Sequence, residues 1–142
     1  MSENTTHLAV LANMNSIRHA SAKNKTAWLA LYRDDAVLRD PVGVSPLDPA
    51  GAGHIGKAAI EKFYDTVIAN ANITMTPGQR ITSGQYTCAV PMHCVNDLGG
   101  GIKTEVDMIA VYEVDDQGLI KSMSAYWNFD AMMDQMKKLG LA

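Results

Sequence analysis

The character of the chain changes near residue 72. Before this point, apolar residues recur at the spacing of a helix face over residues 5–33 and 57–71. After it, three strand-like runs are separated by the hairpin signals NDLGGG and DDQG. Helices followed by antiparallel strands predict an α+β fold, in which helices cover one face of a curved sheet. Such an arrangement encloses a cone-shaped apolar interior suited to a small molecule.

The first half of the chain is expected to be mostly helical. The residues SAKNK, 21–25, interrupt the first helical stretch, and Thr26 is the expected cap of a second helix that continues to Asp35. The helix over 57–71 has an apolar stripe formed by Ile60, Phe63, Tyr64 and Val67.

A short strand and a long loop are expected between these helices. The residues AVLRDP, 36–41, alternate as a strand does, which places Leu38 and Asp40 on one face. A loop rich in Gly and Pro follows over residues 42–56. At the other end of the chain, FDAMMDQMKKLG is predicted to form a helix that ends near Gly140.

The composition argues against several classes of partner. Apolar residues make up 47% of the 142 residues and charged residues 19%, which predicts one globular domain over residues 1–142. The net charge of −3 argues against nucleic acid or an anionic membrane as a partner, and no apolar run is long enough to span a bilayer. The first residues lack the pattern of a signal peptide, so a cytoplasmic location is expected.

Neither metal chemistry nor thiol chemistry is expected. Cys88 and Cys94 lack the companions that a zinc site needs, so both are predicted to be free thiols. His93 and Cys94 are neighbours on a strand, so their side chains should point to opposite faces. The histidines, at positions 7, 19, 54 and 93, show no ligand spacing. We therefore expect no metal and no cofactor.

Asp40 lies between a strand and Pro41, and this position permits two interpretations. Asp favours turns of this kind, where its side chain bonds to the nearby backbone. At the mouth of an apolar cone, the same carboxylate would be partly desolvated, which raises its pKa and makes it a better base. The spacing alone leaves both interpretations open.

Three segments resemble the ketosteroid isomerase family of the SnoaL-like, nuclear transport factor 2-like superfold. They are LYRDDAVLRDPVG (31–43), GKAAIEKFYD (56–65) and VDMIAVYEVDDQGLIKSMSAYWNFD (106–130). The resemblance runs from about residue 16 to about residue 128, and it is stronger still for a group of mycobacterial isomerase-like proteins. It implies a fold of this class and a homodimer packed through the open face of the sheet.

The resemblance implies that Asp40 is the general base, which takes a proton from the carbon next to a ketone and returns it two carbons away. The two oxyanion donors of the family are replaced, because Ser16 stands at the position of its Tyr and Ala110 at that of its protonated Asp. Asp107 lies three residues before Ala110, on the opposite face of the strand. Losing one such donor typically costs on the order of 10²–10³ in rate.

Several side chains are candidates to replace these donors. Tyr64 matches a family Tyr that bonds to the catalytic one, and its hydroxyl would reach the pocket beside the small Ser16. Ser16 itself is a donor, directly or through a water. His19 lies one turn later and would serve as a donor or acid if it faces inward, whereas the other interpretation is a locally bonded helix residue. Trp127 matches a family residue that lines the pocket and carries a donor N–H, and core packing is also compatible with it.

Alternation and the resemblance place five more side chains inward. They are expected either to contact the ligand or to belong to the core: Met92, Cys94, Met108, Ala110 and Met123. Methionine adapts to irregular apolar shapes, so a cone lined in this way suits a large, flat, apolar ligand such as a sterol or polyketide.

These features together indicate a ketosteroid-isomerase-like enzyme that needs no cofactor and acts on a hydrophobic, steroid-like small molecule. The two missing donors favour a first alternative, a binding protein for steroids without catalysis. A second alternative is another reaction on the same fold, such as cyclisation, dehydration or epoxide opening. Epoxide opening there would use an Arg–Asp pair and a further Asp, but this chain has Ser124 and Asn128 where an acid would be needed.

Overall fold

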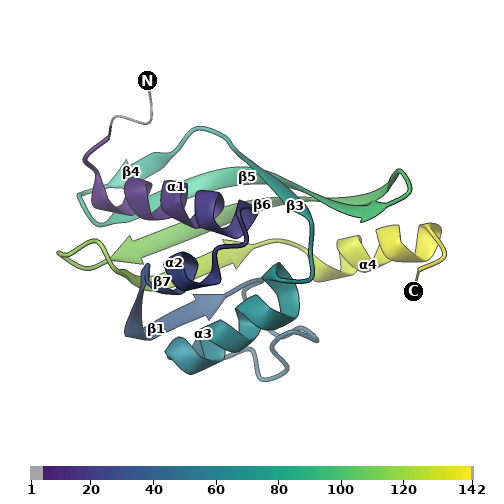
Figure 1. The fold of residues 1–142 in the computed structure, drawn as a ribbon, viewed down its shortest axis with the longest axis horizontal. Coiled ribbons are helices and arrows are strands. Elements are labelled where there is room, and N and C mark those ends of the chain that lie inside the picture. Colours follow the sequence, from purple (N-terminus) through teal and green to yellow (C-terminus); the bar gives the residue numbers. More distant parts are fainter. Residues whose placement is uncertain (1–4, 142) are drawn as a thin grey trace.

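The structure is a computed structural model, which describes residues 5–141. Residues 1–4 and 142 of the expected domain lie outside the described residues. Three helices, α1 (Leu8–Ser21), α2 (Lys25–Leu29) and α3 (Lys57–Phe63), lie over one face of a sheet (Figure 1). The helix α4 (Phe129–Lys138), yellow in Figure 1, lies beside β6 (Ile102–Val114), where the N–H of Glu105 donates a hydrogen bond to Gln135 Oε1 at 2.8 Å.

The sheet follows the order β2-β1-β7-β6-β5-β3, with β4 also paired to β5. The strands are β1 (Tyr32–Arg39), β2 (His54–Ile55), β3 (Ile73–Pro77), β4 (Ile81–Ser83), β5 (Thr87–Gly99), β6 (Ile102–Val114) and β7 (Ile120–Tyr126). β1 runs parallel to β7, whereas the other paired strands are antiparallel. The predicted α+β fold with a curved, unclosed sheet is confirmed.

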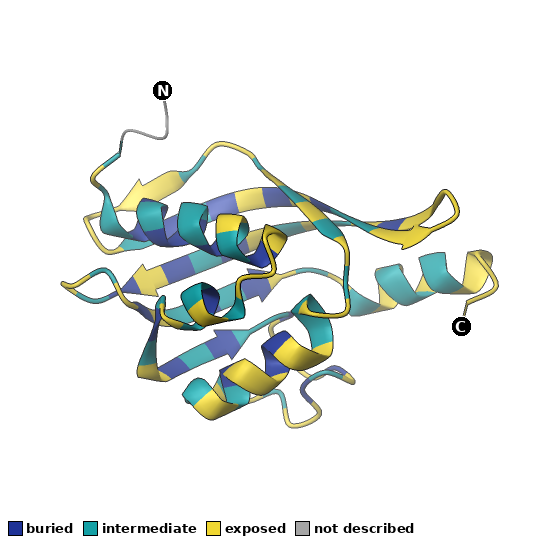
Figure 2. Cartoon of the chain, viewed as in Figure 1, coloured by how far each residue is buried: buried dark blue, intermediate teal, exposed yellow. Residues whose placement is uncertain are grey.

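The core lies between the sheet and the helices, and Figure 2 shows buried residues alternating with more exposed ones along the strands. Alternation on the long strands produces this pattern, because every second residue faces the helices. Leu38, Val90 and Ala110 are fully buried in this way. Trp28 of α2 packs on Tyr32 and Tyr64, with ring centroids 4.8 Å and 5.4 Å away. This aromatic cluster holds α2 and α3 against the start of β1.

The buried face of α1 contains more than apolar residues. Ala9, Asn13, Ser16 and Ala20 are all buried, and they recur at intervals of three or four residues. The side chain of His7 caps the helix by accepting a hydrogen bond from the backbone N–H of Val10 at 3.3 Å. α1 therefore presents two polar side chains to the interior, one turn apart.

The second helix was predicted wrongly at both ends. Asn24 is its cap and accepts a hydrogen bond from the N–H of Ala27 at 3.1 Å, where Thr26 was expected. The helix ends at Leu29, and the residues expected to extend it to Asp35 belong to β1. Parallel pairing with β7 and burial of Tyr32 outweigh the local helical preference of this segment.

Two further predictions need adjustment. The helix expected over 57–71 becomes a π-helix, η1, at Tyr64–Ile68. The loop over 42–56 contains β2, whose residues pair with Val37 and Leu38 of β1. The helix expected near the C-terminal end is confirmed as α4, and Cys88 and Cys94 are confirmed as free, buried thiols. Within residues 5–141, no helix is long and apolar enough to cross a membrane.

Candidate functional site

A cavity of about 430 Å³ lies between the sheet and the helices. This volume is within the range of pockets that bind drug-sized ligands. Its wall is mainly apolar and includes all six residues predicted to face inward: Met92, Cys94, Met108, Ala110, Met123 and Trp127. The exposed residues Lys23, Asn70 and Asn72 lie at its rim. The chain therefore offers a largely apolar chamber for a small molecule.

Asp40 contributes a carboxylate to this chamber. It follows the last residue of β1, at the end where β1 runs beside β7. The pairing continues past Asp40, because the N–H of Val42 donates to the carbonyl of Ala125 at 2.9 Å. The indole Nε1 of Trp127 donates a hydrogen bond to Asp40 Oδ1 at 2.6 Å. The strand ends thus fix both the position and the orientation of the carboxylate.

The surroundings of Asp40 change its acidity. Burial raises the pKa of its carboxyl group from 3.8 to about 6, and the hydrogen bond from Trp127 opposes this shift without cancelling it. The sequence prediction of a raised pKa is confirmed. A carboxylate with a pKa near 6 is ionised at neutral pH and is a stronger base than an exposed Asp. It is therefore suited to proton transfer.

A second polar group lies in the cavity wall, contributed by α1, β1 and β6. Tyr112 Oη donates a hydrogen bond to Ser16 Oγ at 3.3 Å, and both residues are buried. Tyr32 Oη is also buried, but no hydrogen-bond partner is present for it among residues 5–141. The hydroxyl groups of Ser16, Tyr32 and Tyr112 therefore belong to the wall of a cavity that is otherwise mostly apolar.

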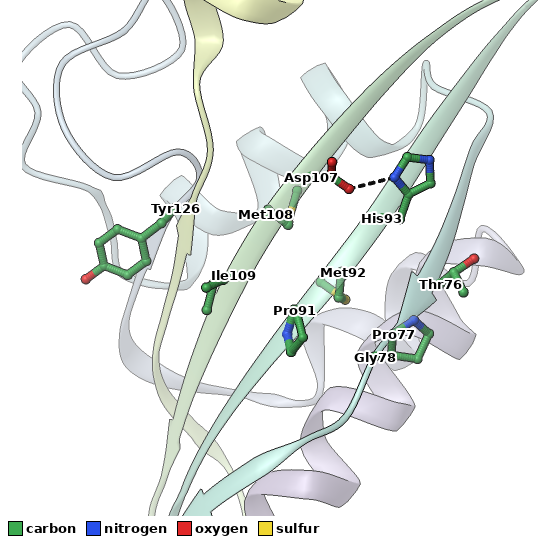
Figure 3. A pocket seen from close by; sticks show the side chains of 10 residues that line it. All are labelled: Thr76, Pro77, Gly78, Pro91, Met92, His93, Asp107, Met108, Ile109 and Tyr126. Atoms are coloured by element: carbon green, nitrogen blue, oxygen red, sulfur yellow. Dashed lines mark hydrogen bonds and ion pairs between the residues drawn. The ribbon is translucent and has the colours of Figure 1, made fainter.

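The opposite face of the sheet carries a separate, open groove of about 490 Å³, drawn in Figure 3. Pro91, Ile109 and Tyr126 line it. His93 lies at its edge and bonds to Asp107 through Nδ1 at 2.7 Å. This groove is open to solvent, and none of its lining residues is among the described residues that have a buried polar side-chain atom without a partner. The internal cavity is therefore the better candidate for chemistry.

The comparisons with known proteins agree with this geometry. The sequence pattern of the SnoaL-like domain matches residues 15–123. The chain belongs to the SnoaL-like domain family. A steroid Delta-isomerase of Nocardioides simplex is 34% identical to it over 101 residues, which cover 71% of this chain and 74% of that protein. The resemblance found in the sequence is therefore confirmed at the level of the family.

Solved structures support the same assignment. The Delta 5-3-ketosteroid isomerase of a Mycobacterium species is 35% identical, with a TM-score of 0.83, and the match covers 89% of this chain and 98% of that one. The protein RV0760c from Mycobacterium tuberculosis, in complex with estradiol-17beta-hemisuccinate, is 36% identical with a TM-score of 0.82. That match covers 88% of this chain and 97% of the other.

Two of the predicted site residues do not line the cavity of this SnoaL-like domain. His19 is half-buried outside the cavity wall, because Ser16 and Ala20 occupy the inner face of α1 and His19 is rotated away from Ala20 by about 100°. Tyr64 is buried and packs on Trp28, and it is not among the residues that line the cavity. Neither residue belongs to the cavity wall, so the donor roles expected for them stay predictions.

Other predicted placements agree with this SnoaL-like structure. Ser16, Asp40 and Ala110 all line the cavity. Asp107 faces outward, as the alternation predicted, and its carboxylate is exposed beside His93. His93 and Cys94 point to opposite faces, since Cys94 lines the cavity and His93 the outer groove.

The sequence reasoning missed two residues of the site, Tyr32 and Tyr112. Tyr112 was detectable, because it lies two residues after Ala110 on β6 and so faces the same side of the sheet. Tyr32 was hidden by the prediction of a helix through this segment. If β1 begins at Tyr32, alternation places Ala36, Leu38 and Asp40 on the same face of the strand as Tyr32. Asp34 is an exception to this pattern, because it is exposed.

Proposed function

We propose that this protein is a ketosteroid-isomerase-like enzyme, with Asp40 as its general base. Asp40 removes a proton from the carbon between the ketone and the double bond of a 5-ene-3-ketosteroid. The same group returns the proton two carbons away, so the double bond moves into conjugation with the ketone. The reaction conserves all atoms and uses only groups of the chain itself.

The observation that carries this proposal is the raised pKa of Asp40 inside an apolar cavity. A carboxyl group must be ionised before it accepts a proton. Burial destabilises the charged carboxylate, so accepting a proton is more favourable for it than for an exposed carboxylate. The relatives named as steroid isomerases support the reaction class, and the similar protein RV0760c has been solved in complex with estradiol-17beta-hemisuccinate. These points support steroid-like ketones as the substrates of this chain.

The pH dependence of the rate tests the proposal. We expect kcat/KM for 5-androstene-3,17-dione to rise with pH, reach half of its maximum near pH 6 and remain constant above about pH 7. The sign follows from the base, because protonated Asp40 cannot accept the substrate proton. The formation of the conjugated enone is followed by ultraviolet absorbance across pH 4–8.

The Trp127→Phe variant serves as the matched control for this profile. The indole N–H lowers the pKa of Asp40, so removing it should move the midpoint to higher pH. A midpoint near pH 4, or one that does not move in this variant, would contradict Asp40 as the titrating base. Steroid binding without turnover by the wild-type protein would favour the alternative, a binding protein.

We also propose that two copies of the chain pack together through the outer groove. Ile109 and Tyr126 are 50% and 54% exposed there, which is unusual for large apolar side chains so close together. Since the groove lies on the face that the helices leave open, burying it does not obstruct the internal cavity.

The proposed dimer predicts a particular effect of one charge in the groove. Light scattering should give twice the mass of the chain for the wild-type protein. Ile109→Asp should give the mass of a single chain, because a carboxylate would be buried without a partner at the centre of the contact. Ile55→Asp, at an exposed position of β2 outside the groove, is the control and should remain dimeric. A monomeric wild-type protein would refute the proposal.

A further inference from the structure

The hydroxyl of Tyr32 is the most conspicuous unsatisfied group in the cavity. The residue is 1% exposed, and Oη has no hydrogen-bond partner among residues 5–141. A buried polar group left in this state costs about 1–3 kcal/mol, so such groups usually have a partner that the protein itself does not supply. Because Tyr32 lines the cavity, a bound ligand is in position to supply that partner.

Ser16 presents a second hydroxyl to the same cavity. Its Oγ accepts a hydrogen bond from Tyr112 Oη at 3.3 Å, and it makes no other side-chain hydrogen bond among the described residues. Accepting this bond leaves the hydrogen of Ser16 free to point into the cavity. A hydroxyl that accepts one hydrogen bond also becomes a better donor in the next.

The Ser16–Tyr112 pair is supported from the side away from the cavity. Asn13, fully buried and one turn before Ser16 on α1, accepts a hydrogen bond from Arg80 Nε at 2.8 Å. Burial raises the pKa of the Tyr112 hydroxyl, whereas Ser16 and Asn13 lower it. A row of polar side chains therefore runs from the half-buried Arg80 inward to the cavity.

Asp40 lies close enough to influence both tyrosines. Burial raises the pKa of the Tyr32 hydroxyl well above its usual range, and the charge of Asp40 raises it further. The same charge also raises the pKa of Tyr112. Both phenols therefore remain protonated at neutral pH and are available as donors. A base and hydroxyl donors thus share one mostly apolar chamber.

We propose that the oxygen atom of the ligand is bound between the hydroxyl groups of Tyr32 and Ser16, with Tyr112 as the residue that positions Ser16. The assignment rests on the proposed function for the identity of this oxygen, a ketone oxygen that becomes an enolate during proton transfer. The ligand class is accordingly a flat, fused-ring ketone or phenol whose oxygen enters the chamber first. Ala110, which also lines the cavity, contributes only a methyl group and offers the oxygen no hydrogen bond.

A comparison of two probes of nearly equal shape tests this site. 2-Naphthol carries one hydroxyl, whereas naphthalene carries none, and the fluorescence of each reports its binding. The measurements use the Asp40→Asn background, so they do not depend on whether the protein is an isomerase. Tyr32→Phe and Ser16→Ala should each weaken 2-naphthol binding by about 10-fold or more and change naphthalene binding by less than about twofold.

Tyr112→Phe requires a spectroscopic readout, because Tyr112 acts through Ser16. We expect a smaller loss of 2-naphthol affinity, about threefold, together with a smaller ionised fraction of the bound naphthol in its emission spectrum. Tyr86→Phe, which removes an exposed hydroxyl outside the cavity, is the matched control and should change neither probe.

Two outcomes would overturn the oxygen site. The first is an unchanged ratio of 2-naphthol to naphthalene affinity in Tyr32→Phe and Ser16→Ala variants that fold normally. The second is that the Asp40→Asn protein binds 2-naphthol and naphthalene with equal affinity. This outcome can be measured even if the Tyr32→Phe and Ser16→Ala variants fail to fold. A preference for 2-naphthol without isomerase activity in the wild-type protein would refute the proposed function but retain the oxygen site.

Discussion

Replacing Asp40 by Asn should lower kcat for the isomerisation of a 5-ene-3-ketosteroid by about 10²–10⁴-fold, the usual contribution of a positioned general base. Asn keeps the shape of the side chain and still accepts a hydrogen bond from Trp127 Nε1, but it cannot take up the substrate proton. KM should change much less, because the apolar wall of the cavity remains intact.

Asp34→Asn is the appropriate control for this experiment. Asp34 belongs to the same strand, but its side chain is 97% exposed and forms one ion pair among residues 5–141, with Lys57 at 3.9 Å. The control should retain the wild-type rate. If Asp40→Asn lost less than about threefold in kcat, the carboxylate would not be the base, because even a weak general base contributes more than this.

The same substitution should make the protein more stable. The pKa of Asp40 is about 6 in the folded protein, whereas the ordinary value of 3.8 applies when the chain unfolds. Above pH 6 the wild-type protein therefore holds a charge that burial disfavours, and Asn removes this charge. We expect Asp40→Asn to raise the free energy of unfolding by about 2 kcal/mol at pH 7–8.

The direction of the pH dependence makes this expectation specific. As the pH falls from 6 towards 4, folded wild-type Asp40 takes up its proton, so the advantage of the variant should shrink and vanish below about pH 4. The difference in free energy of unfolding is measured by urea unfolding of the wild-type protein, Asp40→Asn and Asp34→Asn at several pH values. An advantage independent of pH, or one also seen in Asp34→Asn, would rule out relief of a buried charge as its cause.

The strand residues of the site were the most predictable part of the molecule. On β5, β6 and β7, alternation alone places Met92, Ala110 and Met123 on the inner face, because the period of two holds along a regular strand. Asp40 was located in the same way from Leu38. The raised pKa of Asp40 followed from its expected position at the edge of an apolar interior.

The helical half was less predictable because tertiary packing decides it. His19 and Ser16 both belong to the apolar pattern of α1, and only the position of the sheet shows that Ser16 faces it. Tyr32 was assigned to a helix because its neighbours suit one, but pairing with Ile120, far along the chain, makes it a strand residue. Local sequence contains no sign of that partner.

The parallel pairing of β1 with β7 has a consequence for how the protein acquires its reactive group during synthesis. Asp40 and Trp127 are separated by 87 positions, yet one holds the other in place. Among the strands of residues 5–141, β7 is the last to leave the ribosome. Until β7 inserts between β1 and β6, both of these strands lack the neighbour that joins them. A nascent chain that stops before Ile120 therefore carries the carboxylate but lacks the strand and the indole that orient it.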